Sequence, residues 1–184
     1  MSAIAAVADV TREAPDPARS KVSGIDPASF RTALGRFLTG VTIVTTTGPS
    51  GEPVGMTANA FTSVSLDPPL VMVCVARSAA SFAAMEKAES YAVHILHHDQ
   101  HELSGTFALS AAQGAEKFAG VAWHRSADGL PLLDECLARF ECLIIRRIEL
   151  GDHIGYLGHV GAAAIEAAAS PLAFFQGRYA RLAG

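Results

Sequence analysis

The sequence predicts a mainly β protein with short helices, in which an antiparallel sheet curls into a barrel. Several segments are rich in β-branched residues, or alternate between apolar and polar residues as half-buried strands do. The helical patterns are few and short. Most strands follow one another without a crossover helix, which disfavours a doubly wound fold. A chain of 184 residues has the length of a single domain.

The first expected element is a helix that begins at Asp26-Pro27. Asp is a favoured N-cap residue, and Pro is favoured at the first helical position. Gly40 can end the helix. Between them, apolar residues with helical spacing predict one apolar face: Phe30, Ala33, Leu34, Phe37 and Leu38.

Strands dominate the following segment. The β-branched run VTIVTTT predicts a strand over 41–47, and GPSGEP predicts a turn. Residues 55–66 predict a strand, a bend and a second strand, and LVMVCVA predicts a buried strand over 70–76. A short helix is expected over 78–88, with Ser78 as its N-cap.

The middle of the chain predicts another strand and another helix. YAVHIL forms the strand, over 91–96. Asp99 and Glu102 resemble a capping box that opens a helix ending near Leu109, with Leu103 and Phe107 on one face. Residues 110–134 are expected to be mostly loop.

A long hairpin is expected towards the C-terminus. Apolar and charged residues alternate from Ala138 to Leu150, which predicts a long half-buried strand. Its partner begins at His153, after a Gly-Asp turn, and is expected to run to Ala168. Residues 171–182 add a short final segment.

Composition and charge narrow the class of protein. The net charge is −4, without the basic stripe that a nucleic-acid partner requires, and no apolar run reaches the roughly 20 residues that span a bilayer. The three cysteines form no C-x-x-C pair, which favours a reduced, cytoplasmic chain. Residues 1–23 are expected to form a mobile tail, and residues 24–184 the folded domain.

Four histidines, His94, His97, His98 and His101, fall close together in the sequence. His97 and His101 are four residues apart, a spacing that can place two imidazoles on one helix face. However, the expected helix begins after His97, and His94 lies in a strand. A polar loop at a helix start is the favoured interpretation, and no metal is expected.

Two polar segments are candidates for ligand binding. VARSAASF places Arg77, Ser78 and Ser81 where a strand meets a helix, which suits a phosphate, although Ser78 could serve only as a cap. GMTANAFTSVSLDPP is dense in small hydrogen-bonding residues that suit a flat polar ring. An edge strand with an exposed face would give the same composition.

Taken together, these segments resemble the short-chain flavin reductases, the reductase components of two-component flavin-dependent monooxygenases. The matching stretches are FRTALGRFLTGVTIVTT, PVGMTANAFTSVSLDPPLVMVCVARSAASF, KFAGVAWH, GDHIGYLGHV and PLAFFQGRYARL. The resemblance implies an antiparallel split β-barrel that binds FMN or FAD. It also implies a homodimer, NADH or NADPH as reductant, and a separate monooxygenase that receives the reduced flavin.

The resemblance also implies roles for individual residues. Those expected to line the flavin ring are Met56, Thr57, Ala58, Asn59, Ser63, Val64 and Ser65. Those expected at the phosphate end are Ala76, Arg77, Ser78, Ser81 and Phe82. Lys117 and Phe118 approach the flavin, Tyr179 lies in the matching terminal segment, and His153 lies near the nicotinamide as the catalytic residue.

The chemistry agrees with this assignment. Hydride transfer needs two flat rings held face to face, and the cofactors carry the reaction. The chain has no G-x-G-x-x-G, so any dinucleotide binds without a Rossmann fingerprint. Two alternatives stay open: a flavin-binding barrel that stores or carries cofactor without turnover, and a barrel that binds other proteins without any cofactor.

Overall fold

The computed structural model describes residues 24–109, 114–166 and 168–182, so the tail expected over 1–23 lies outside the described residues. The helices are α1 (Pro27–Leu34), α2 (Phe82–Lys87) and α3 (His101–Ala108), with 3-10 turns η2 (His98–Gln100) and η3 (Gly114–Phe118). The strands are β1 (Thr39–Gly40), β2 (Thr42–Thr47), β3 (Pro53–Ala58), β4 (Phe61–Leu66), β5 (Pro69–Ala76), β6 (Ser90–Ile95), β7 (Trp123–Arg125), β8 (Pro131–Leu133), β9 (Ala138–Leu150), β10 (His153–Ile165), β11 (Ala173–Phe175) and β12 (Arg178–Ala180).

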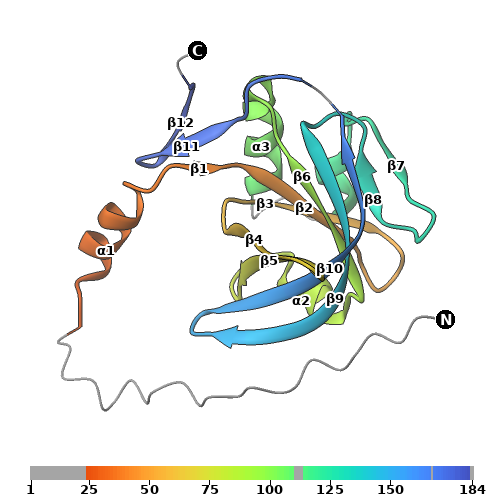
Figure 1. The fold of residues 1–184 in the computed structure, drawn as a ribbon, viewed down its shortest axis with the longest axis horizontal. Helices are drawn as coiled ribbons and strands as arrows, with labels where there is room; N and C mark the ends of the chain where they lie inside the picture. Colours follow the sequence, from red (N-terminus) through yellow and green to blue (C-terminus); the bar gives the residue numbers. More distant parts are fainter. Residues whose placement is uncertain (1–23, 110–113, 167, 183–184) are drawn as a thin grey trace.

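One antiparallel sheet forms the body of the molecule (Figure 1). Its seven strands run in the order β3-β2-β6-β9-β10-β5-β4, so the two edge strands are consecutive in the chain. Only Asn59 and Ala60 separate them, and the Cys74 amide donates to the Ala60 carbonyl at 2.9 Å. The sheet thus curls back towards its own edge, and the expected split β-barrel is confirmed.

The expected hairpin of β9 and β10 is the longest feature of the sheet. β9 covers the predicted residues, whereas β10 ends at Ile165, earlier than expected. β10 also pairs with β5, and this register places His153 directly beside Ala76. The first residue of β10 therefore lies beside the last residue of β5.

Gly158 of β10 permits close packing in the core. A Cβ there would collide with the phenol of Tyr91 and would lie 2.8 Å from Cβ of Cys142. The Tyr91 hydroxyl in turn donates to the Tyr156 carbonyl at 3.2 Å. The absence of a side chain at Gly158 therefore admits the Tyr91 ring.

His94 of β6 is fully buried and joins three strands. Its Nδ1 lies 3.1 Å from the Ile43 carbonyl of β2, and the Leu133 amide of β8 donates to its Nε2 at 3.1 Å. A carbonyl only accepts, so Nδ1 carries the proton and the ring is neutral. Burial lowers the pKa of His94 to about 4.

The helices differ most from the sequence prediction. α1 ends at Leu34, not near Gly40, and none of its residues is buried. α2 begins at Phe82, not Ser78. α3 begins at His101, after η2, and the capping box joins His97 and Gln100 instead of Asp99 and Glu102.

The segment expected to be mostly loop holds short regular elements. Its described part contains η3 and the hairpin of β7 and β8. Leu103 and Phe107 of α3 lie on one face as predicted, packed into a core cluster with Phe118 and Leu133. In the described part of the chain, no helix has both the length and the apolar character needed to cross a membrane.

Candidate functional site

An open cleft of about 230 Å³ lies between β3 and the end of β5. Segments far apart in the chain line it, and they meet because β10 lies against β5 and α3 lies against β3. The lining residues are Met56, Thr57, Ala58, Asn59, Ala60, Cys74, Val75, Ala76, Ala79, Ala80, Ser81, Phe107, Ala108, Leu109, Lys117 and His153.

A second hollow of about 360 Å³ adjoins the cleft. The two share Ala80, Ser81 and Lys117 as lining residues. The second hollow is also lined by the cationic side chain of Lys87 and the carboxylate of Glu52. The cleft and this hollow together offer room for an elongated ligand with an anionic part.

Small side chains give the cleft the character of a slot for a flat ring. Six of its lining residues are alanines with only a methyl group: Ala58, Ala60, Ala76, Ala79, Ala80 and Ala108. Side chains this small leave room for a flat ring to lie close to the backbone. The lining fits a flavin.

Lys117 supplies a buried cation to the lining of both hollows. Its Nζ donates to the Phe107 carbonyl at 2.9 Å and to the Gly55 carbonyl at 3.4 Å. Burial lowers the pKa of this ammonium from its ordinary value, because two neutral carbonyls replace only part of the lost hydration. An anion bound at this ammonium would restore the lost stabilisation.

Ser81 is buried at the boundary between the two hollows. It occupies the N-cap position of α2 but makes no side-chain capping bond there. Its hydroxyl instead donates to the sulfur of Met56 at 2.9 Å, which ties α2 to β3. The prediction that Ser78 caps this helix is wrong, because residues 77–81 form turns before the helix begins.

His153 enters the cleft from the start of β10. Gly151 has a φ of +65°, which permits the tight turn before it, and the Asp152 carbonyl accepts from the Arg77 amide at 2.9 Å. Nδ1 of His153 lies 2.7 Å from Oδ1 of Asp152. This hydrogen bond lowers the pKa of the Asp152 carboxyl. A carboxylate only accepts, so Nδ1 donates, and this bond fixes the orientation of the ring.

The structure brings half of the sequence-predicted site residues into this cleft. They are Met56, Thr57, Ala58, Asn59, Ala76, Ser81, Lys117 and His153. Ser63, Val64 and Ser65 lie instead on the edge strand β4, outside the lining, where a register shift falls between Ser63 and Ser65.

The remaining predicted residues lie behind or beside the lining. Arg77 forms an ion pair with Glu149 at 3.3 Å and lies over the Phe82 ring, and Ser78 is exposed in the adjoining turn. Phe118 is buried edge-on against Phe107.

Tyr179 lies behind α3. Its hydroxyl donates to Oγ of Ser104 at 2.9 Å, and the Ser104 carbonyl accepts from the hydroxyl of Thr57 at 2.6 Å. Tyr179 therefore helps to fix α3 against β3.

Sequence reasoning missed half of the lining, namely Ala60, Cys74, Val75, Ala79, Ala80, Phe107, Ala108 and Leu109. Cys74 and Val75 directly precede a predicted residue, and Ala79 and Ala80 lie between two of them. Residues 107–109 carry no local signal of a site, because only the packing of α3 against β3 brings them to the cleft.

The fold and the cleft define a class: split barrels with a cleft that fits a flavin. The family model of the flavin reductase like domain matches residues 34–183 of this chain. The chain therefore belongs to the flavin reductase like family, and the resemblance seen in the sequence is confirmed.

Several relatives are reductases. FMN reductase (NADH) SmoA of Agrobacterium fabrum is 42% identical over 86% of this chain and 87% of its own length. The reductase subunit Stc3 of stachydrine N-demethylase from Rhizobium meliloti is 44% identical over 77% of this chain. The chain spans 60% of Stc3 and 43% of a probable flavin reductase from the same organism.

A solved structure shows the same fold. The NADH:FAD oxidoreductase SgcE6 of Streptomyces globisporus C-1027 superimposes with a TM-score of 0.81 at 38% identity, covering 90% of this chain and 99% of that one. SgcE6 has also been solved in complex with NAD and FAD fragments.

Proposed function

We propose that this protein reduces FMN or FAD with NADH or NADPH and releases the reduced flavin to a separate flavin-dependent monooxygenase. The observation that carries the proposal is the cleft, which gathers His153, Lys117 and the segment 56–59 in a chain of the flavin reductase like family. Relatives named as reductase components of monooxygenases support the partner, among them the 4-nitrophenol monooxygenase reductase of Rhodococcus opacus.

The residues have distinct proposed tasks. Met56 to Asn59 and the alanines hold the flat ring, with Ser63 to Ser65 on the neighbouring edge strand. Ala76 to Ser78, Ser81, Phe82 and Lys117 hold the phosphate end, Phe118 supports Phe107, and Tyr179 supports α3. His153 positions the nicotinamide through Nε2, while Asp152 fixes its ring. The flavin, when bound, supplies the acceptor for the hydride.

The chain's own groups need to move no proton during the hydride transfer. The cleft contributes by holding two rings in contact, roughly 3 to 3.5 Å apart at the reacting atoms. A cytoplasmic location is part of the proposal, because Cys74, Cys136 and Cys142 are all free thiols.

The experiment that tests the proposal is NADH oxidation by the purified protein at increasing concentrations of added FMN or FAD. Turnover is expected to rise with flavin and saturate. If fluorescence quenching shows that flavin binds but no NADH is oxidised, the protein would instead be a carrier of flavin. The absence of both binding and turnover would indicate a protein without this cofactor.

The homodimer is also part of the proposal. Five large apolar residues between 25 and 38 are exposed on and beside α1, and Figure 1 shows this helix standing away from the sheet. They are Ile25, Phe30, Leu34, Phe37 and Leu38. Such a patch on a chain of this size is typical of a protein interface.

Substitution of Phe37 by Asp is expected to weaken the dimer at least about tenfold, because Phe37 is 77% exposed in one chain and its burial would contribute roughly 1.5–3 kcal/mol. Sedimentation velocity over a range of protein concentrations measures the shift. Ala119→Asp, on an exposed residue beyond η3, serves as the control. A wild-type chain that sediments as an active monomer at assay concentration would contradict the dimer.

A further inference from the structure

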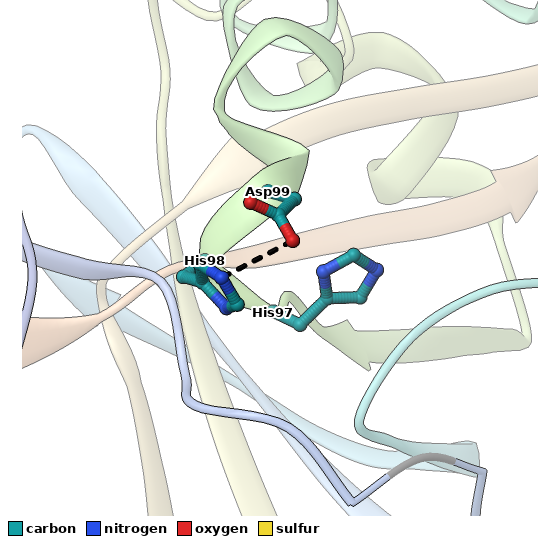
Figure 2. Close-up of side chains that lie close together, drawn as sticks. All are labelled: His97, His98 and Asp99. Atoms are coloured by element: carbon teal, nitrogen blue, oxygen red, sulfur yellow. Dashed lines mark ion pairs between the residues drawn. The ribbon is translucent and has the colours of Figure 1, made fainter. Parts of the chain in front are cut away.

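Three consecutive residues with metal-ligating side chains gather where β6 leads into α3. They are His97, His98 and Asp99, and one ligand atom from each lies within 4.8 Å of the others. Figure 2 shows a carboxylate oxygen of Asp99 lying between the two imidazole rings. The cluster is separate from the cleft, since none of the three lines it.

His98 is already oriented as a metal ligand would be. Its Nε2 lies 3.1 Å from Oδ2 of Asp99, and its Nδ1 faces the Ser170 carbonyl at 3.4 Å. The same carbonyl accepts from the His98 backbone amide at 2.9 Å. A histidine that binds a metal through one nitrogen commonly donates the other N–H to a backbone carbonyl, which fixes the tautomer and the ring.

The spacing of the donor atoms suits a small divalent ion. Two ligands at about 2.1 Å from a tetrahedral ion are about 3.4 Å apart, close to the separation of His98 Nε2 and Asp99 Oδ2. The ligand atom of His97 lies within 4.8 Å of the other two. Its ring now accepts from the Gln100 amide, and the metal would take over that lone pair.

We propose that His97, His98 and Asp99 bind one divalent transition-metal ion of the Zn²⁺ type, with water completing its coordination. Two imidazoles and one carboxylate are a donor set that such ions favour. The site differs from the pair weighed in the sequence, because the His101 ring lies against Tyr179, with 6.4 Å between ring centroids. It also replaces the expectation that no metal binds.

The position of the cluster gives the ion a structural consequence. It lies directly before α3, whose last residues Phe107 and Ala108 line the cleft. An ion there would fix the side chains of His97 and His98, whose backbones already contact Pro171 and Ser170, and would so stabilise the segment that leads into this helix.

Isothermal titration of the metal-stripped full chain with Zn²⁺ tests the proposal. The wild type is expected to show a binding step that His98→Ala and Asp99→Asn each weaken at least roughly tenfold. His124→Ala is the matched control, because His124 forms a surface pair with Asp134 at 2.5 Å. Among the described residues, this pair belongs to no group of three metal-ligating side chains. This control is expected to bind Zn²⁺ as the wild type does.

Co²⁺ provides a second readout that depends only on coordination. The wild type is expected to give visible absorption bands of protein-bound Co²⁺, and Asp99→Asn is expected to weaken them. Asp99 is exposed, so this variant leaves the core unchanged. The proposal is overturned if the wild type binds no Zn²⁺, or if both His98→Ala and Asp99→Asn retain wild-type affinity.

Discussion

Acidification from about pH 7.5 to about pH 4 is expected to destabilise the folded chain by about 3 kcal/mol through His94 alone. The ring is fully buried and neutral, and burial lowers its pKa to about 4, against an ordinary value of 6.5. The loss is a large share of the roughly 5–15 kcal/mol that stabilises a typical domain.

The direction of the effect follows from where the proton binds. Between pH 6.5 and about 4, the unfolded chain binds a proton at His94 that the folded chain does not. The stabilisation from His94 is therefore complete above pH 6.5 and declines as the pH falls through this window. Protonation of the folded state would place a second N–H against the Leu133 amide, which already donates to Nε2.

Urea unfolding at a series of pH values measures this effect, with His94→Gln as the comparison. The variant loses its ring partners at Ile43 and Leu133, so it is expected to be less stable by roughly 2–4 kcal/mol near neutral pH. Its stability should then depend less on pH between 6.5 and 4 than that of the wild type. Equal pH dependence in the two proteins would contradict the assignment.

Local sequence patterns predict the strands well. Alternation over 138–150 gives β9 its observed bounds, and the β-branched run at 41–47 gives β2 with a difference of one residue. Both signals depend on neighbouring residues in one strand. The three-residue strands β7 and β8 are too short to produce such a signal and were expected to be loop.

Helix starts were harder to predict because distant groups decide them. The expected helix at Ser78 begins only at Phe82. The Arg77 amide donates to the carbonyl of Asp152, so the backbone at the end of β5 stays tied to the β9–β10 turn. No pattern within 76–88 carries information about that turn.

The candidate site shows the same contrast between local sequence signals and long-range packing. His153, Lys117 and the segment 56–59 carry recognisable chemistry, and the structure brings them to one cleft. Phe107 to Leu109 reach the same cleft only because α3 packs on β3. The apolar face of α1 was also predicted, but a single chain leaves it uncovered.

Replacement of His153 by Ala is expected to lower kcat/KM for the nicotinamide by roughly 10- to 100-fold. The side chain lines the cleft, and the Asp152 carboxylate holds Nδ1 at 2.7 Å. The variant therefore loses a positioned ring together with its Nε2 atom. The flavin should still bind within about twofold of its normal affinity, because the alanines and Lys117 that line the rest of the cleft are unchanged.

Steady-state kinetics at varied nicotinamide and saturating flavin, with a parallel flavin titration, measure both quantities. His153→Asn keeps a hydrogen-bonding side chain and should recover part of the loss. Asp152→Asn should give a smaller loss in the same direction, since it weakens only the orientation of the ring. His159→Ala is the matched control, because His159 lies on the same strand outside the cleft. Loss of flavin binding in His153→Ala with normal nicotinamide kinetics would place this histidine on the flavin side of the site.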